Sequence, residues 1–280
     1  MRALVTGATS GIGKETAVRL AALGADLIIV ARQSDRGRAA AEEIRRRVPG
    51  ARVEVVTADL SSIERVRRLA DEVLIRADRL DVLVNNAGVI TTRRQLTADG
   101  LESTFAINHL APFLLTNLLR GLLESSSPAR VVTVSSGAHK QVRAVPWGEI
   151  ARGSESGHGR AYPLSKLCNI LFTVELAKRL AGTGVTANCL HPGFVRSDLG
   201  RDLTGVLGAL VKGVLLLRPG PATGAETSVY LATSPEVAGV TGGYFVKCKP
   251  AEPSALAQDA EAAARLWELS EELVRGAGRP

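Results

Sequence analysis

Short runs of aliphatic and β-branched residues alternate with longer helical patterns, and this alternation limits the fold more than any other feature of the chain. The runs predict strands at 2–6, 25–31, 52–57, 80–85, 129–135, 184–190 and 242–247. The patterns between them predict helices at 12–23, 35–47, 62–76, 99–124, 161–181 and 221–233. Several of these strands are apolar throughout, as expected where helices cover both faces of a parallel sheet. The sequence therefore predicts an α/β fold with a doubly wound, mostly parallel sheet of seven strands.

The chain length and the interruptions of this alternation indicate how the chain is organised. A length of 280 residues suits a single domain over 1–280, because α/β folds of this size often close as one unit. The alternation is interrupted near 137–160 and 198–220, each time after the carboxyl end of a strand, where open α/β sheets bind ligands. We expect these stretches to be variable loops that bind substrate. Residues 254–275 predict a C-terminal helix with one apolar side.

Charge, cysteine content and the first residues exclude several classes of protein. The net charge of +7 is spread along the chain, and only 4% of the residues are aromatic, so we expect no nucleic-acid partner. The three cysteines, Cys168, Cys189 and Cys248, have no metal-ligand or disulfide spacing, and we expect no metal. Because a strand-like run follows Met1 directly, we expect no leader, no anchor or other integral membrane segment, and a cytoplasmic protein.

A glycine-rich turn joins the first predicted strand to the first predicted helix. Glycines in such a turn let the backbone approach a pyrophosphate, and the N-terminus of the following helix attracts its negative charge. A tight turn without any ligand is the alternative, but the position between a strand and a helix favours a dinucleotide site. The candidate cofactor-binding residues in this turn are Gly7, Thr9, Ser10, Gly11, Ile12 and Gly13.

The end of the second predicted strand carries an arginine where NAD-binding proteins of this type carry a carboxylate. Arg32 there suits the 2′-phosphate of NADP, and Arg36 is close enough in sequence to assist it. Two alternatives stay open: Arg32 is an ordinary surface residue, or Asp35 accepts the ribose hydroxyls of NAD. We predict that NADPH is preferred over NADH.

A tyrosine and a lysine stand four residues apart at the start of a predicted helix. Tyr162 and Lys166 therefore share one face of that helix. A fixed ammonium beside the phenol stabilises the phenolate, so we expect it to lower the pKa of Tyr162 towards the working range of a proton relay. Ser136 ends a predicted buried strand at the same sheet edge, where its hydroxyl is placed to hold a substrate oxygen. The alternative is that Ser135 and Ser136 only turn the chain.

Taken together, these motifs resemble the short-chain dehydrogenase/reductase family over residues 1 to 247. Further motifs occur in the expected order: Asp59-Leu60, Asn85-Asn86-Ala87-Gly88, Asn108 and His191-Pro192-Gly193-Phe194-Val195. The resemblance implies a Rossmann-type fold and a catalytic tetrad of Asn108, Ser136, Tyr162 and Lys166. It also implies that Tyr162 and Lys166 contact the cofactor. The other cofactor contacts that it implies are Asp59, Leu60, Asn86, Ala87, Gly88, Pro192, Gly193, Val195 and Ser197.

Within that family the chain looks like the retinol dehydrogenase and protochlorophyllide reductase branch, which often reduces lipophilic carbonyl compounds with NADPH. The resemblance therefore implies an oxidoreductase that interconverts an alcohol and a carbonyl compound, with a small lipophilic substrate. A catalytically silent NADP sensor on the same fold is the alternative, although a sensor needs no complete tetrad. Members of the family often pair through helices that correspond to 99–124 and 161–181, so we expect a homodimer or homotetramer. His191 is interpreted as a packed core histidine.

An apolar stripe follows the segment that the resemblance places at the nicotinamide. Its members recur at helical spacing: Leu203, Val206, Leu207, Leu210, Val211, Val214 and Leu215. The stripe serves as a helix packed on the core, as a lid over the substrate, or as a patch that touches a membrane, and the sequence leaves all three open. If it is a lid, we expect it to form the wall of the substrate pocket together with Trp147.

Overall fold

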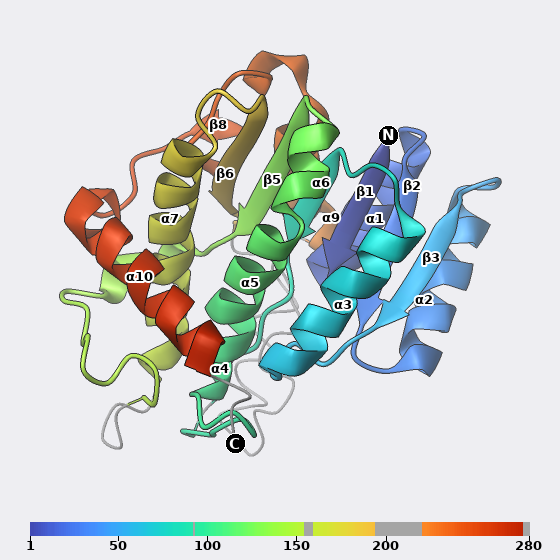
Figure 1. Cartoon of the computed structure of the whole chain (residues 1–280). Coiled ribbons are helices and arrows are strands. Elements are labelled where there is room, and N and C mark those ends of the chain that lie inside the picture. Colours follow the sequence, from blue (N-terminus) through green and yellow to red (C-terminus); the bar gives the residue numbers. More distant parts are fainter. Residues whose placement is uncertain (92, 154–158, 194–219, 277–280) are drawn as a thin grey trace.

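The computed structural model describes residues 1–91, 93–153, 159–193 and 220–276, and its centre is one twisted sheet (Figure 1). The strand order is β3-β2-β1-β4-β5-β6-β7-β8, and all neighbours are parallel except β7 and β8. The strands are β1 (Arg2–Thr6), β2 (Asp26–Ala31), β3 (Val53–Thr57), β4 (Val82–Asn85), β5 (Ala129–Val134), β6 (Val185–His191), β7 (Tyr244–Val246) and β8 (Lys249–Pro250). The order reverses beside β1, which places the ligand-binding crevice at the carboxyl ends of β1 and β4.

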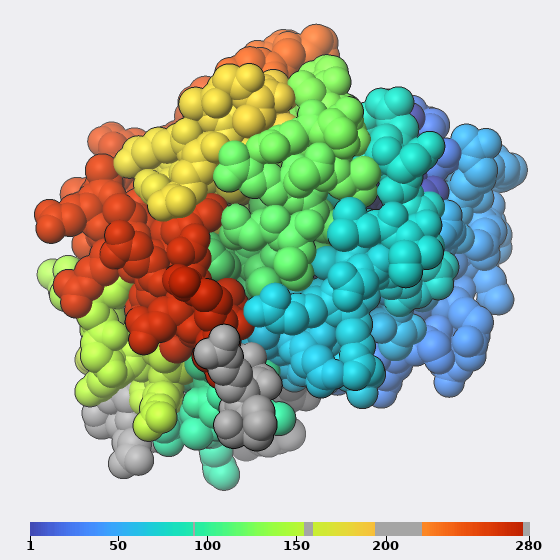
Figure 2. Space-filling model, viewed as in Figure 1, coloured from blue at the N-terminus to red at the C-terminus, as the bar shows by residue number. Residues whose placement is uncertain are grey.

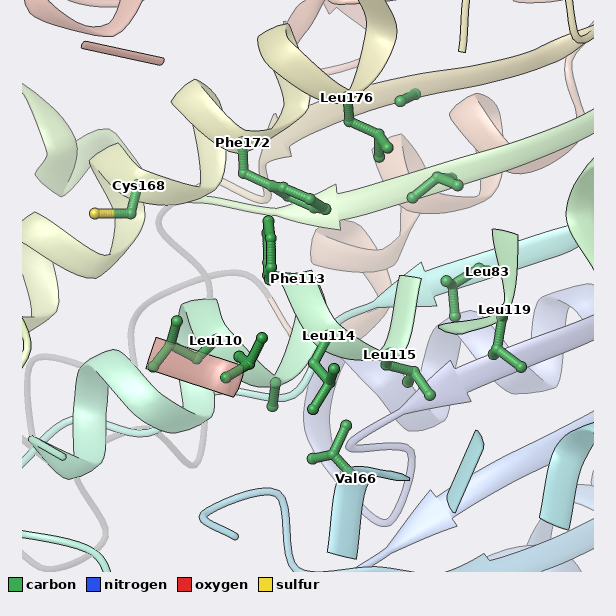
Figure 3. Close-up of a cluster of buried hydrophobic side chains, with 14 of the residues drawn as sticks. Val66, Leu83, Leu110, Phe113, Leu114, Leu115, Leu119, Cys168, Phe172 and Leu176 are labelled. Carbon is green, nitrogen blue, oxygen red and sulfur yellow. The ribbon is translucent and has the colours of Figure 1, made fainter. Parts of the chain in front are cut away.

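Helices cover both faces of the sheet, as the apolar strands predict (Figure 1). One face is covered by α1 (Gly11–Ala22), α2 (Ser34–Arg47) and α9 (Pro221–Thr233). The other face is covered by α3 (Ile63–Arg76), α5 (Ala111–Leu118) and α7 (Ala161–Arg179). On this second side Val66, Leu114 and Phe172 project into a continuous apolar core (Figure 3). These layers confirm the predicted α/β fold of the Rossmann type.

The structure departs most from the predicted elements in three places. The helix predicted over 99–124 is broken into α4 (Ser103–Phe105), a π-turn (Ala106–Leu110), α5 and α6 (Arg120–Ser125). The Glu102 carboxylate caps the start of α4 by accepting hydrogen bonds from the backbone N–H groups of Thr104 and Phe105. An eighth strand, β8, adds an antiparallel edge to the seven predicted strands. The C-terminal helix α10 (Ala260–Gly276) begins later than predicted, after a 3₁₀ turn at Ala255–Gln258.

Helix α10 lies across the outer side of α5 and α7, as the ribbon and the space-filling view both show (Figure 1, Figure 2). Trp267 contacts the ring of Phe113 at a centroid distance of 4.9 Å and that of Phe172 at 5.9 Å. The guanidinium of Arg179 lies 4.3 Å from the Trp267 ring. The chain's own α10 thus covers one side of the helices through which subunits are expected to pair, and the homodimer or homotetramer stays a prediction.

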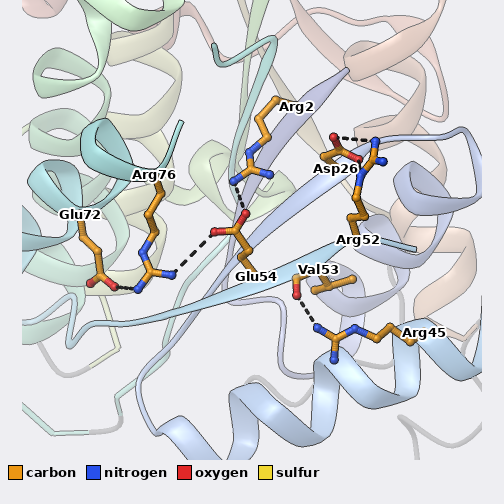
Figure 4. A network of polar contacts seen from close by, with 8 residues as sticks. All are labelled: Arg2, Asp26, Arg45, Arg52, Val53, Glu54, Glu72 and Arg76. Atoms are coloured by element: carbon orange, nitrogen blue, oxygen red, sulfur yellow. Dashed lines mark hydrogen bonds and ion pairs between the residues drawn. The ribbon is translucent and has the colours of Figure 1, made fainter. Parts of the chain in front are cut away.

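Charged side chains join the amino ends of the first three strands, on the edge opposite the crevice (Figure 4). Arg2 Nη2 lies 2.6 Å from one oxygen of Glu54, and Arg76 Nη1 lies 3.7 Å from the other. Arg52 pairs with Asp26 over 2.6 Å. Exposed pairs of this kind contribute at most about 1 kcal/mol each.

Within the described ranges, no helix combines the length and the apolar character needed to cross a bilayer.

Candidate active site

A cavity of about 480 Å³ opens at the carboxyl ends of the central strands, between the turn after β1 and the start of α7. The sequence-predicted residues that line it are Gly7, Thr9, Ser10, Gly11, Ile12, Gly13, Arg32, Asp59, Leu60, Asn86, Ala87, Gly88, Tyr162, Lys166 and Pro192. The lining residues outside the predicted set are Val30, Ala31, Gln33, Ala58, Val89, Ile90, Ile107, Val134 and Ser135. Most of these residues lie within two positions of a predicted site residue at the end of a strand, so their neighbourhood in sequence could have identified them.

The turn after β1, residues 6–13, and Asn86 form a glycine cradle at the floor of this cavity. Gly7 has a φ of +67°, and a Cβ added there would lie 2.8 Å from Ala87 Cα. A Cβ on Gly13 would lie 2.4 Å from the Gly7 carbonyl oxygen and 2.3 Å from Asn86 Nδ2. Because real Cβ atoms do not approach other atoms so closely, only glycine fits at these two positions. The two missing side chains let the turn pack closely against Asn86 and Ala87 at the end of β4. The turn then leads into the N-terminus of α1, which attracts the negative charge of a pyrophosphate.

Asn86 braces the glycine cradle from the end of β4. Its Nδ2 donates hydrogen bonds to the carbonyl oxygens of Thr6, at 2.9 Å, and Gly7, at 3.3 Å. The backbone N–H groups of Asn86 and Ala87 both donate to Thr6 Oγ1, at 3.0 Å each. These bonds fix the cradle against the neighbouring strand, as the family resemblance implies for Asn86.

Two arginines from the end of β2 and the start of α2 line the next part of the cavity. Arg32 and Arg36 are both exposed lining residues. Asp35, the residue that favoured NAD, pairs instead with Arg38 and does not line the cavity. Among the described lining residues the one carboxylate is Asp59, whose Oδ1 accepts hydrogen bonds from Ser61 N at 3.0 Å and Ser61 Oγ at 2.8 Å. The local charge therefore suits an added phosphate better than ribose hydroxyls alone.

Tyr162 and Lys166 enter the other end of the cavity from the first two turns of α7. Lys166 is buried, its Nζ donates to the Val134 carbonyl oxygen at 2.9 Å, and this nitrogen lies 5.7 Å from the centre of the Tyr162 ring. Burial lowers the pKa of Lys166 to about 8. Burial also raises the pKa of Tyr162, although a hydrogen bond with the Ser136 side chain opposes this rise. The expected net lowering of the pKa of Tyr162 towards the working range is therefore wrong in this structure, because desolvation has the largest effect on the phenol.

Asn108 and Ser136 lie beside the cavity without lining it. Asn108 projects from the π-turn, and its amide exchanges hydrogen bonds with the backbone of Val89, at 2.8 Å and 3.0 Å, and donates to Ser165 Oγ at 3.0 Å. A Cβ on Gly88 would lie 3.4 Å from Asn108 Oδ1 and 3.5 Å from Lys166 Nζ, so these two side chains approach the same point. The structure thus brings all four residues of the expected tetrad together from the turn after β5, the π-turn and α7.

Other predicted positions lie elsewhere. Gly193, with a φ of +86°, is described but does not line the cavity, and Val195, Ser197 and the apolar stripe between Leu203 and Leu215 lie outside the described residues. His191 is half-buried, and a Cβ on Gly137 would lie 3.4 Å from its Nε2. The proposed role of Trp147 in the pocket wall is not supported. Its ring lies against the apolar core with the Arg265 guanidinium at 4.6 Å, and it does not line the cavity.

Comparison with known proteins adds independent information about this site. The model of the short chain dehydrogenase family matches residues 1–205. Human retinol dehydrogenase 14 is 44% identical over 294 residues, which cover 97% of this chain and 85% of that relative. Human retinol dehydrogenase 12 is 43% identical over 274 residues, with the same shares of 97% and 85%.

Solved structures agree with these relatives. An uncharacterised protein from Mycobacterium paratuberculosis superimposes with a TM-score of 0.78 at 35% identity, covering 98% of this chain and 93% of its own. The Pseudomonas aeruginosa RhlG/NADP active-site complex superimposes with a TM-score of 0.70 at 27% identity, covering 87% and 93%. The described cavity lies in the part of the chain that the family model matches.

Proposed function

As this chain belongs to the short-chain dehydrogenase family, whose members are oxidoreductases that act on CH–OH donors with a nicotinamide cofactor, we propose that it uses NADP(H) to interconvert a lipophilic alcohol and its carbonyl compound. The retinol dehydrogenases at 40–44% identity support a substrate that is mostly apolar. The tetrad supports an active enzyme over a silent sensor.

The observation that carries the NADP assignment is the charge at the end of β2. Arg32 and Arg36 line the cavity where the adenosine ribose of a dinucleotide lies in folds of this type. The nearby carboxylate of Asp35 is paired with Arg38. A guanidinium binds a phosphate through strong, charge-assisted hydrogen bonds, so this end of the cavity favours a 2′-phosphate.

The residues at the other end of the cavity handle the proton and orient the reacting oxygen. When bound, the nicotinamide supplies or accepts the hydride. Tyr162, whose pKa is raised by burial, is protonated at neutral pH and donates its proton to a carbonyl oxygen in the direction of reduction. Ser136 shares a hydrogen bond with the phenol and holds the same oxygen. Lys166, beside the ring, stabilises the phenolate once the proton has left.

Titration with NADPH and NADH by calorimetry tests the cofactor assignment. We expect NADPH to bind at least about tenfold more tightly, because one charge-assisted contact is worth roughly 1.5–3 kcal/mol. Arg32→Ala should remove most of this preference and leave NADH binding unchanged. Arg46→Ala, which removes an exposed arginine from the far end of α2, is the matched control. Equal affinities in the unaltered protein would contradict the assignment.

A spectrophotometric assay with a homologous series of aldehydes tests the substrate class. We expect kcat/KM to rise with chain length, because each additional buried methylene contributes about 0.8 kcal/mol. Tight NADPH binding without turnover of any aldehyde, ketone or alcohol would favour the sensor instead. A flat or falling series would exclude a lipophilic substrate but leave the oxidoreductase assignment in place.

A further inference from the structure

Two buried histidines lie close in sequence to catalytic side chains and have no part in the chemistry proposed above. His109 follows Asn108 in the π-turn, and His139 stands three residues after Ser136. The side chains of both histidines are inaccessible to solvent. Each forms a hydrogen bond with the last described part of the chain, residues 251–276, which we call the C-terminal segment. This segment follows the residues that the family model matches.

His139 joins the turn that carries Ser136 to the start of the C-terminal segment. Its Nδ1 lies 2.7 Å from the Ser136 carbonyl oxygen, and its Nε2 lies 3.1 Å from the backbone nitrogen of Ser254. A backbone N–H only donates, so Nε2 must be the acceptor and Nδ1 must carry the proton. The neutral imidazole thus donates to Ser136 and accepts from Ser254. The ring of Tyr244 packs edge-on against it at 5.2 Å, which holds the imidazole in this orientation.

His109 joins the π-turn that carries Asn108 to helix α10. Its Nε2 lies 2.9 Å from Ser270 Oγ, and this hydroxyl also lies 2.7 Å from the Leu266 carbonyl oxygen one turn earlier in α10. Phe105 and Phe172 surround the imidazole at centroid distances of 5.1 Å and 6.2 Å. Burial lowers the pKa of His109 to about 3, so the ring is neutral under ordinary conditions.

We infer that the C-terminal segment is a positioning element of the active site, which fixes Ser136 through His139 and the Asn108 turn through His109. Both imidazoles are buried, and a hydrogen bond of a buried group is costly to leave unmade. Ser136 holds its place through its backbone carbonyl as well as through Ser136 Oγ, which accepts from Ala138 N at 3.2 Å. Loosening either histidine therefore shifts a catalytic side chain without touching the cofactor cavity.

This inference rests on the proposed function, because that function makes Ser136 and Asn108 catalytic residues. Two other roles for the histidines give different results in the tests below. If His139 only closes its own turn, its contact with Ser254 is irrelevant to turnover. If both residues only stabilise the fold, their loss lowers the melting temperature and leaves kcat unchanged.

His139→Asn and Ser254→Pro break the same hydrogen bond from its two sides. An asparagine amide occupies the place of Nδ1 and still donates to Ser136, but it does not reach Ser254. Proline removes only the N–H donor and the small side chain, since Ser254 has a φ of −66°, which suits proline. We expect each variant to lower kcat about tenfold with an unchanged Kd for NADPH, because small misplacements of catalytic groups are costly. The double variant should lose no more than either single one.

Wild-type kcat in both His139→Asn and Ser254→Pro would overturn the role of His139. Hydrogen exchange of the peptide around residues 136–142 gives a second readout that needs no substrate. We expect faster exchange in both variants, and exchange as slow as in the unaltered protein would also overturn it. If the unaltered protein turned over no substrate at all, the proposed function would be refuted. The hydrogen-exchange measurement does not depend on that function, so it tests the role of His139 separately.

Ser270→Ala tests the contact of α10 with His109. We expect kcat to fall about threefold to tenfold, in line with the loss of one buried hydrogen bond, with little change in Kd for NADPH. Ser228→Ala is the matched control, because Ser228 is an equally buried serine on α9, which covers the face of the sheet opposite to α7. Equal kcat values for these two variants would overturn the role of His109.

Discussion

The glycine cradle and the tetrad lie in one cavity but are built in different ways. The cradle is formed by consecutive backbone groups, and its shape depends on side chains that are missing at Gly7 and Gly13. The tetrad is assembled from residues up to 58 positions apart in sequence, and its shape depends on hydrogen bonds between side chains and distant backbone groups. A substitution in the cradle therefore disrupts it through steric overlap, whereas a substitution in the tetrad disrupts it by removing a polar partner. The tetrad also destabilises the fold when it is intact, because the ammonium of Lys166 is buried.

The largest effect should come from removing the proton donor of the tetrad. Tyr162→Phe keeps the ring and its packing but deletes the phenol hydroxyl, so we expect kcat to fall by about 10²–10⁴, the usual contribution of general acid–base catalysis. The Kd for NADPH, measured by calorimetry, should stay within about twofold, because the cradle is untouched. Turnover near that of the unaltered protein would refute the mechanism.

A smaller but still large effect should come from filling the cradle. Gly13→Ala places a methyl group against the Gly7 carbonyl oxygen and Asn86 Nδ2, which should cost about 1–3 kcal/mol through forced displacement and weaken NADPH binding at least about tenfold. Gly121→Ala in α6 is the control, since an added Cβ there meets no atom within 4 Å. This control should stabilise the protein slightly, by up to about 1 kcal/mol. Equal NADPH affinities in the two variants would refute the steric account.

The smallest of the three changes in free energy sharpens the contrast, because it should be an increase in the stability of the fold. Lys166→Met replaces a buried ammonium by an apolar chain of similar length, so we expect it to abolish turnover while raising the free energy of unfolding at pH 7 by on the order of 2 kcal/mol. Urea denaturation measures this difference. A less stable variant would show that the Val134 contact outweighs the desolvation of Lys166.

The pH dependence of this difference follows from the pKa of Lys166, which is about 8 in the folded protein against 10.5 for an ordinary lysine. Between these two values the unfolded chain binds more protons than the folded one, so the unaltered protein gains stability as the pH rises. The penalty from Lys166 is complete below pH 8. The advantage of Lys166→Met should therefore shrink above pH 8 and disappear above about 10.5.

The first half of the fold and the glycine cradle could be predicted closely from the sequence. The strand predicted at 2–6 is β1, and the helix predicted at 62–76 is α3 within one residue, because both rest on local apolar periodicity and on local caps such as Ser62. The cradle is equally local, since the residues that form its turn are consecutive.

Elements that depend on contacts across the fold could not be predicted. The π-turn is an example: Asn108 projects from it towards Val89, a residue brought close only by the completed sheet. The hairpin of β7 and β8 turns through Lys247 and Cys248 with positive φ values of 51° and 59°, where a sequence normally signals such a turn with glycine or asparagine. The spacing of Tyr162 and Lys166 predicts that the ammonium acts on the phenol, but the extent to which burial opposes this effect depends on the packing around α7.

The position of α10 also determines what the intrinsic fluorescence of this protein reports. The chain has two tryptophans, Trp267 on α10 and Trp147 under Arg265 of the same helix. Detachment of α10 exposes both indoles to water and separates Trp267 from its cationic neighbour Arg179, while the cradle and β1 to β3 contain no indole. Tryptophan emission during denaturation therefore follows the docking of one helix, and circular dichroism follows the whole sheet. A denaturant range in which the two signals separate would isolate a state with an intact cradle and an undocked α10.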